Sequence, residues 1–286
     1  MPFLETADKT ALFTTDSGAG SPVVFVHGWP LSSAMWEYQI PVIAAQGYRC
    51  IAYDRRGFGR SDQPWSGYDY DTLADDLAAV IDAYDLHDVT LVGFSMGGGE
   101  VARYLSRHGA GRVARAVLIS SVTPMLATTP DHPDAVDPGV FEAMLDGIAR
   151  DRPTFMASFA RQFYGAGLLN FTVTSELLAW TGALAMQGAA RATTECVRAF
   201  GFTDFRPDMA AFTMPTLIIH GDADATVPIA VSARAAAALI PGAMLLEYGG
   251  AAHGLFFTEK DRLNADLLAF LADRVPQSPG LMPTIA

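Results

Sequence analysis

Gly93-Phe-Ser-Met-Gly97 is the stretch that decides the fold predicted for this chain. It follows a short apolar, β-branched run at residues 88–92, typical of a buried strand, and precedes a helical pattern over residues 98–108. A serine between glycines at a strand-to-helix turn is the nucleophile-elbow motif. The glycines have a physical reason, because a Cβ two residues before or after the serine would meet neighbouring backbone. We therefore expect Ser95 to lie at a helix N-terminus, where free N–H groups favour a developing negative charge.

Strand-like and helix-like segments alternate along the chain on both sides of this motif. Short β-rich runs occupy residues 10–15, 23–26, 48–53, 88–92, 116–120, 215–219 and 244–248. Helical patterns occupy residues 34–46, 72–84, 98–108 and 259–274. We expect Asp71 or Thr72 to start the second of these helices. Such alternation predicts an α/β fold, with a mostly parallel twisted sheet and helices on both faces.

The alternation stops between residues 124 and 205. This segment has no convincing strand, and its sequence signals instead predict helices that start at Asp137-Pro138, at Pro153 and at Ser175. We interpret it as a helical cap inserted into a single domain. The expected parts are a core of residues 1–123 and 206–275, a cap at about 124–205, and a flexible tail at 276–286.

The composition excludes several classes of protein. The 286 residues carry a net charge of −12, which argues against nucleic acid and anionic membrane surfaces as partners. No apolar run reaches the ~18 residues of a membrane span. The N-terminal segment has no apolar core of a secretory signal, and Cys50 and Cys196 lie far apart without metal-ligand spacing. We therefore expect a cytoplasmic protein with reduced cysteines and no membrane contact.

Two later segments supply the partners that a serine nucleophile needs. In α/β-hydrolases the acid follows a late strand and the histidine follows the last strand. Here His220-Gly-Asp-Ala-Asp224 follows the run that ends at residue 219, and His253 follows the run that ends at residue 248. The His253 imidazole would take the proton of Ser95, and a carboxylate would fix the tautomer of that imidazole. Spacing alone leaves Asp222 and Asp224 as competing candidates for this carboxylate.

An oxyanion hole is expected from two backbone N–H groups. One belongs to Met96, directly after the nucleophile, and the other to Trp29, in the loop after His27-Gly28. The Trp29 ring would also form an apolar wall. His27 and His220 each precede a glycine at a strand end, so we expect them to brace loops rather than act as bases.

Several motifs, spread over nearly the whole chain, resemble one known group of enzymes. They are Val26-His-Gly-Trp-Pro-Leu31, Ala34-Met-Trp-Glu37, Tyr53-Asp-Arg-Arg-Gly-Phe-Gly-Arg-Ser61, Gly67-Tyr-Asp-Tyr-Asp-Thr72, Gly93-Phe-Ser-Met-Gly-Gly98, Thr203-Asp-Phe-Arg206, His220-Gly-Asp222 and His253-Gly254. In this order they resemble the cofactor-free bacterial haloperoxidases, an α/β-hydrolase group that includes aryl esterases, perhydrolases and γ-lactamases. The resemblance implies that Asp224 is the acid of the triad. Ala252 departs from the group, which usually has proline before the histidine.

The resemblance also implies a chemistry. We expect a serine esterase that acts on small uncharged esters or acids through an acyl-Ser95 intermediate, and that forms peracids when hydrogen peroxide replaces water. The sequence has no haem-ligating or metal-ligand context, so neither a cofactor nor a metal is expected. Members of the group often form symmetric oligomers, which implies a homo-oligomer here. The alternatives are a lactamase or other amide hydrolase with the same triad, and a non-catalytic ligand-binding protein of the same fold.

Overall fold

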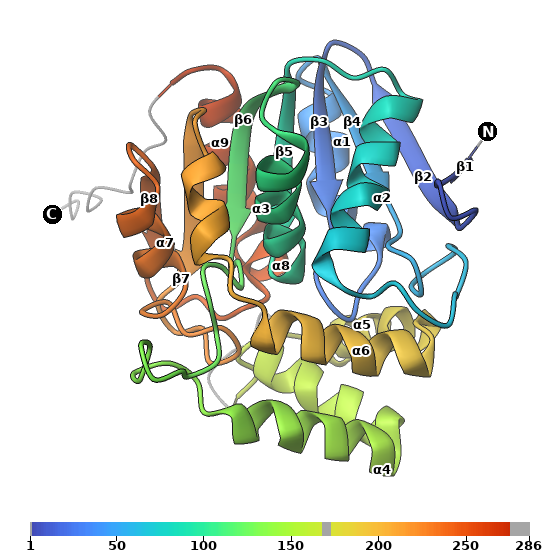
Figure 1. Cartoon of the computed structure of the whole chain (residues 1–286), viewed down its shortest axis with the longest axis vertical. Helices are drawn as coiled ribbons and strands as arrows, with labels where there is room; N and C mark the ends of the chain where they lie inside the picture. The colour runs from blue at the N-terminus through green and yellow to red at the C-terminus, as the bar shows by residue number, and fades with distance from the viewer. Residues whose placement is uncertain (1, 168–172, 275–286) are drawn as a thin grey trace, which may run out of the picture.

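A twisted sheet runs through the centre of the molecule (Figure 1). The computed structural model describes residues 2–167 and 173–274, which form eight strands in the order β1-β2-β4-β3-β5-β6-β7-β8. The strands are β1 (Phe3–Glu5), β2 (Ala11–Gly18), β3 (Ser21–Val26), β4 (Tyr48–Tyr53), β5 (Val89–Phe94), β6 (Val113–Ile119), β7 (Thr216–Gly221) and β8 (Met244–Tyr248). β2 is antiparallel to β1 and β4, and all other neighbouring pairs are parallel. The predicted mostly parallel sheet is confirmed.

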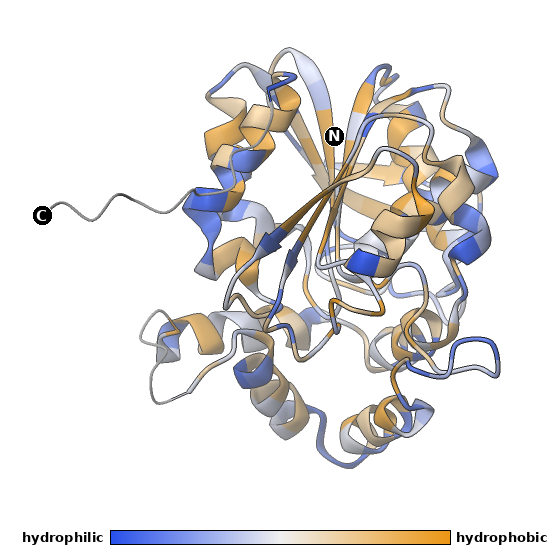
Figure 2. Cartoon of the chain, turned by 90° about the vertical axis from the view of Figure 1, so that its left-hand side faces the viewer, coloured by the Kyte–Doolittle hydropathy of each residue, from blue (hydrophilic) through white to orange (hydrophobic). Residues whose placement is uncertain are grey.

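Helices cover both faces of this sheet. They are α1 (Ile40–Ala44), α2 (Tyr70–Ala83), α3 (Met96–His108), α4 (Pro138–Phe163), α5 (Ser175–Gln187), α6 (Ala190–Phe202), α7 (Ala233–Leu239), α8 (Leu255–Thr258) and α9 (Lys260–Leu271), with 3-10 turns η1 (Ser33–Tyr38) and η2 (Arg206–Ala211). In β3, Val24 and Val26 belong to the core shared with α2, α3 and α7, whereas Val23 and Phe25 belong to the core shared with α1 and α9. Figure 2 shows the apolar strands between the helices on either side. Burial on both faces explains why these strands are continuous apolar runs.

The strand order places two loops side by side at one end of the sheet. The chain passes from β3 to β4 on one side of β3, and then to β5 on the other side. Because β3 and β5 are parallel neighbours, with Val26 opposite Gly93, the loops that follow them leave the sheet together. In α/β sheets, ligands bind at such a reversal, beyond the carboxyl ends of the strands. The nucleophile turn therefore lies beside the loop that starts at His27.

Between β6 and β7 the described residues form three helices, α4, α5 and α6, below the carboxyl ends of the strands in Figure 1. The Asp137 carboxylate caps α4 by accepting a hydrogen bond from the Gly139 N–H, as the Asp137-Pro138 signal predicts. α4 kinks at Asp151, whose carboxylate caps the second half by accepting from the Thr154 N–H. The tail predicted at residues 276–286 lies outside the described residues.

Two predicted helices differ from the structure. The pattern over residues 34–46 forms two short pieces, η1 and α1, because Pro41 lacks the N–H that a continuous helix needs and is tolerated only in a first turn. α2 starts at Tyr70, and its N-cap is Asp69, which accepts from the Thr72 N–H at 3.0 Å. The prediction of Asp71 or Thr72 as its start was therefore wrong. Within the described ranges, no helix has the length and apolarity needed to cross a bilayer.

Candidate active site

Ser95 lies in a turn with a strained backbone. Its φ of 52° and ψ of −118° fall in a region that residues with a Cβ rarely adopt. A Cβ on Gly93 would lie 2.6 Å from the Gly97 carbonyl oxygen, and a Cβ on Gly97 would overlap the Val26 carbonyl oxygen. The predicted need for both glycines is confirmed. α3 begins at Met96, so the Ser95 hydroxyl stands at a helix N-terminus.

Ser95, His253 and Asp224 form one chain of hydrogen bonds. His253 Nε2 lies 2.9 Å from Ser95 Oγ, and His253 Nδ1 lies 2.6 Å from Asp224 Oδ2. All three side chains are buried, with His253 only 1% exposed. In the neutral imidazole, Nδ1–H donates to the carboxylate, and the Nε2 lone pair faces the hydroxyl. This arrangement can accept the hydroxyl proton of Ser95.

The carboxylate of Asp224 is held at both oxygens. Oδ1 accepts hydrogen bonds from the backbone N–H groups of Thr226 and Val227, at 2.9 and 2.8 Å. Burial acts to raise the pKa of Asp224, but attraction to His253 and hydrogen bonds from His220 and His253 outweigh it. The pKa of this carboxyl therefore lies well below its ordinary value. The carboxylate stays ionised wherever the protein is folded at neutral pH.

Asp222, the competing candidate, is hydrogen-bonded elsewhere in the loop region and not to His253. Its exposed carboxylate accepts a hydrogen bond from the Gly250 N–H at 2.6 Å. Of the two aspartates, the structure thus brings Asp224 to His253. In residues 2–167 and 173–274, no group of three or more His, Cys, Asp or Glu side chains is arranged to hold a metal ion.

Two backbone N–H groups near Ser95 are free to bind an oxygen. Gly28 packs against the nucleophile turn, since a Cβ there would lie 3.1 Å from the Ser95 Cβ. Neither the N–H of Trp29, the next residue, nor that of Met96 donates to another described residue. Trp29 and Ser95 also line the same hollow. The two groups expected from the sequence therefore lie beside the nucleophile, and neither has a partner in the part of the chain that the structure describes.

A buried ion pair braces the loop that carries Trp29. Arg55 donates from Nε to Glu100 and from Nη2 to the His27 carbonyl, each at 2.5 Å, and all three residues are unexposed. Burial, and then the charge of Arg55, lower the pKa of His27, so its ring is neutral. His27 Nε2 accepts from the Arg55 N–H, and Nδ1 donates to the Gly28 carbonyl, both at 2.9 Å. Because the C=O and N–H of a trans peptide point in opposite directions, this bond fixes the direction of the Trp29 N–H.

The ring of Trp29 is held by the helices between β6 and β7. Its indole Nε1–H donates to the Thr193 carbonyl of α6 at 3.0 Å. The ring centroid lies 5.2 Å from that of Phe159 on α4 and 5.5 Å from that of Phe200 on α6. Trp29 therefore joins the loop after β3 to α4 and α6, and also forms the predicted apolar wall.

The hollow in front of Ser95 is small and largely apolar. Its volume is about 40 Å³, and its described polar lining residues are Ser95, Thr226 and His253. The apolar lining consists of Trp29, Val122, Leu126, Val136, Val140, Phe141, Met144, Phe159, Phe200 and Val227. One water needs about 10–15 Å³ of such space. The hollow therefore has room for a short acyl group.

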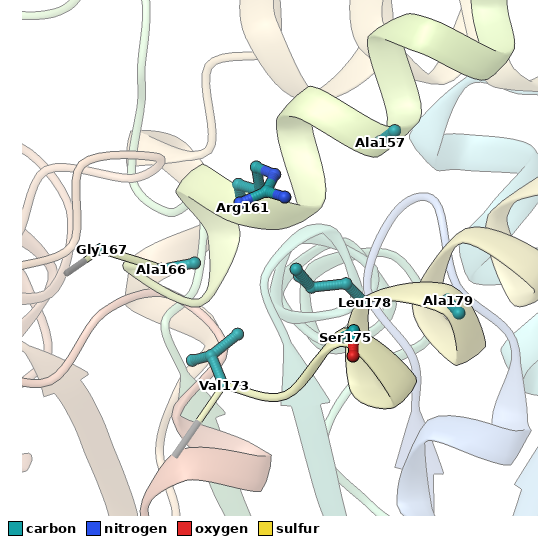
Figure 3. Close-up of a pocket in the computed structure, with 8 residues that line it drawn as sticks. All are labelled: Ala157, Arg161, Ala166, Gly167, Val173, Ser175, Leu178 and Ala179. Carbon is teal, nitrogen blue, oxygen red and sulfur yellow. The ribbon is translucent and has the colours of Figure 1, made fainter. Parts of the chain in front are cut away.

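A larger hollow of about 610 Å³ lies between α4 and α5 (Figure 3). Figure 3 shows Arg161 on α4 and Leu178 on α5 at its edge. Its described lining contains none of Ser95, Asp224 and His253. Because the nucleophile, the base and the free N–H groups meet at the smaller hollow, the smaller one is the candidate active site.

Sequence reasoning missed two features of this site. His220 braces its loop as predicted, by donating to the Val227 carbonyl at 2.9 Å, but its Nε2 also lies 3.2 Å from Asp224 Oδ2. A histidine four residues before a candidate acid was the available signal. The Arg55–Glu100 pair was also missed, although Glu100 is a carboxylate on the apolar side of a helix that starts at the nucleophile.

Comparisons with known proteins agree with the α/β architecture described above. The family model described as "alpha/beta hydrolase fold" matches residues 21–260. A non-heme chloroperoxidase of Kitasatospora aureofaciens is 44% identical over 273 residues, which cover 95% of this chain and 99% of that protein. A bifunctional esterase/perhydrolase of Acinetobacter calcoaceticus is 38% identical over 274 residues, which cover 95% of this chain and 99% of that protein. The crystal structure of a bromoperoxidase from Bacillus anthracis superposes with a TM-score of 0.90, at 43% identity, over 92% of this chain and 96% of that one.

Proposed function

Since the chain belongs to the α/β-hydrolase family, and within it to the group of non-haem haloperoxidases, we propose that it is a serine esterase. Ser95 is the nucleophile, His253 the base and Asp224 the acid, and the N–H groups of Trp29 and Met96 bind the oxyanion. The observation that carries this proposal is the unbroken chain of hydrogen bonds from Asp224 through His253 to Ser95.

The first half of the reaction acylates the enzyme. Ser95 Oγ attacks the ester carbonyl carbon while His253 Nε2 takes the hydroxyl proton. The negative charge that develops on the carbonyl oxygen is bound by the Trp29 and Met96 N–H groups. The tetrahedral intermediate then collapses to acyl-Ser95, and His253 gives its proton to the leaving alkoxide. Asp224 stabilises the imidazolium between these two steps.

The second half of the reaction releases the acyl group. Water, deprotonated by His253, attacks acyl-Ser95 and gives a carboxylic acid and free Ser95. When hydrogen peroxide attacks instead, the same bond breaks and the product is a peracid. This second activity is supported by the similarity to a protein named as a bifunctional esterase/perhydrolase.

The size and apolar lining of the hollow in front of Ser95 favour one class of substrate. About 40 Å³ of apolar space favours short acyl groups, and the described lining offers no Lys or Arg to pair with a charged acyl chain. Burying an unpaired charge there would be costly. We therefore propose small, uncharged carboxylic esters as substrates.

An acylation experiment tests the proposal. With excess p-nitrophenyl acetate, the wild-type protein should release a burst of nitrophenol equal to the enzyme concentration, followed by steady turnover. Ser95→Ala should remove both phases, lowering turnover by several orders of magnitude, because it has no nucleophile. Thermal unfolding of the variant is the control for its fold.

The outcomes separate the alternatives. Ser95→Ala activity above a few per cent of wild type would refute the assignment of the nucleophile. Stoichiometric binding of the ester without a burst would indicate a ligand-binding protein, and faster turnover of lactams than of esters would indicate an amide hydrolase. With hydrogen peroxide present, peracid should form at the expense of free acid.

On the sequence grounds given above, we also propose a cytoplasmic location and a homo-oligomer, which cell fractionation and light scattering would test.

A further inference from the structure

His220 is a buried imidazole that the reaction described above does not use. It lies at the carboxyl end of β7, and its side chain is unexposed. Its Nε2 lies 2.9 Å from the Val227 carbonyl oxygen and 3.2 Å from Asp224 Oδ2. That carboxylate oxygen is the one that binds His253 Nδ1. Two imidazoles therefore contact the same oxygen atom.

The surroundings of His220 determine which ring nitrogen carries the proton. Nε2 faces two oxygens, both of which are acceptors, so an unprotonated Nε2 would bring three lone pairs together. Nδ1 is buried and has no hydrogen-bond partner among the described residues. A proton on Nδ1 would therefore leave a buried donor unpaired, which is costly. His220 Nε2 therefore carries a proton, which is shared between the Val227 carbonyl and Asp224 Oδ2.

We propose that His220 is a positioning residue of the triad, whose Nε2–H holds Asp224 Oδ2 in the orientation that His253 needs and limits the basicity of His253. The inference rests on the function proposed above, because it assigns His220 a role in the proton transfer from Ser95. His220 does not line the hollow in front of Ser95, so it acts through Asp224 and not on the substrate.

The contacts of Asp224 explain the effect on orientation. Two backbone N–H groups hold Oδ1, whereas His253 and His220 are the donors facing Oδ2. Without His220, His253 is the one described donor left at Oδ2, and its own hydrogen bonding changes as it accepts and gives protons. A fixed second donor keeps the carboxylate plane constant during the cycle.

The same contact sets the sign of the effect on basicity. The His220 N–H draws negative charge from Oδ2, which reduces the stabilisation of an imidazolium at His253. Removing this donor concentrates charge on the oxygen and favours the imidazolium. His253 is then protonated at higher pH, so the acid limb of the kcat/KM profile moves to higher pH.

The other ionisable groups near His220 have partners of their own. Glu247 lies opposite His220 on β8 and forms an ion pair with Arg234 at 2.7 Å. Asp222 accepts from the Gly250 N–H. A substitution at His220 leaves these pairs intact, and its effect on the acid limb is assigned to the imidazoles and Asp224.

Two variants separate a positioning role from a purely structural one. His220→Leu removes the donor, and we expect kcat to fall about tenfold, with KM changed less than about twofold and the acid limb moved to higher pH. His220→Gln provides an amide N–H at about the reach of Nε2, and should restore most of kcat and the wild-type acid limb. Ser232→Ala is the matched control. It removes a partly buried hydrogen bond to the Pro228 carbonyl in the same loop, and should lower stability without moving the acid limb.

Proton and nitrogen NMR of the resting protein test the inference without substrate. In the wild type, His220 should show the Nε2–H tautomer, and the low-field resonance of His253 Nδ1–H should shift in His220→Leu but return in His220→Gln. The proposal is overturned if His220 carries its proton on Nδ1, or if Leu and Gln behave alike. An unchanged resonance and acid limb in His220→Leu would equally overturn it. These spectra remain decisive if ester turnover fails, so failure of the proposed function and failure of this inference are distinguishable.

Discussion

Replacing each of the two aspartates that follow β7 tests which of them is the acid of the triad. Asp224→Asn places an amide NH₂ where Oδ2 now accepts from His253 Nδ1, so two donors would meet. The imidazole escapes by moving its proton to Nε2, and Nε2–H then faces Ser95 Oγ and cannot take its proton. The wrong tautomer of a triad histidine costs about 10⁴ in turnover, or about 5 kcal/mol in the barrier.

Asp222→Asn is the matched control, because it changes the same functional group two residues away. Its carboxylate is exposed and accepts one hydrogen bond, from the Gly250 N–H, and the asparagine oxygen can still accept it. A weakened bond of this kind costs at most about 1 kcal/mol, so turnover should stay within about fivefold of wild type.

The assay is kcat/KM for p-nitrophenyl acetate for both variants and the wild type, with circular dichroism and thermal unfolding as controls for folding. A folded Asp224→Asn protein with more than about a tenth of wild-type turnover would refute the reasoning. So would an Asp222→Asn loss larger than the Asp224→Asn loss, which would mean that the wrong carboxylate has been assigned.

Two further predictions follow from burial and close packing. Burial raises the pKa of the Cys50 and Cys196 thiols from 9.0 to about 12, so iodoacetamide at pH 8 should label neither cysteine until urea unfolds the chain, as mass spectrometry would show. The unfolded chain loses these thiol protons near pH 9, whereas the folded protein keeps them. The free energy of unfolding should therefore be highest below pH 9 and should fall as the pH rises toward 12. A urea midpoint that stays constant from pH 8 to 11 would contradict this. In Gly28→Ala, the new Cβ would lie 2.5 Å from a Phe94 ring carbon and 3.1 Å from the Ser95 Cβ. We expect kcat to fall roughly 100-fold and the protein to be destabilised by about 1–3 kcal/mol. A wild-type kcat in this variant would refute the close approach.

Much of the fold could be predicted because its signals are local. The strands at residues 48–53 and 244–248 have the bounds that their patterns predict, and the helix at 175–187 starts at the residue that its pattern predicts. Elements without local signals were missed. α6 has Ala189 at its N-cap position, without a side-chain cap, and α7 and α8 are too short to show a helical period. These short helices depend on packing against the rest of the chain, which a sequence pattern does not contain.

In the candidate site too, residues with a local sequence signal could be predicted and residues without one could not. Ser95 and His253 follow from an elbow motif and the position of the last strand, and both occur in one hydrogen-bonded chain in the structure. The choice between Asp222 and Asp224 did not follow from spacing, because both lie in one loop and only the direction of each side chain separates them. The contact of His220 with Asp224 arises from the curvature of that loop, which brings residues four apart together at a point where no helix predicts it.

The position of Trp29 has a consequence for the modularity of this protein. Its backbone N–H lies beside Ser95. Its ring donates a hydrogen bond to the Thr193 carbonyl and packs against Phe159 and Phe200, all in the helices between β6 and β7. A chimaera that received those helices from a distant relative would keep Ser95 and its hydrogen-bond partners, yet lose the carbonyl and rings that hold residue 29. The helices that line the hollow thus also hold the ring of an expected oxyanion-hole residue, so exchanging them alters the substrate pocket and the packing of residue 29 together.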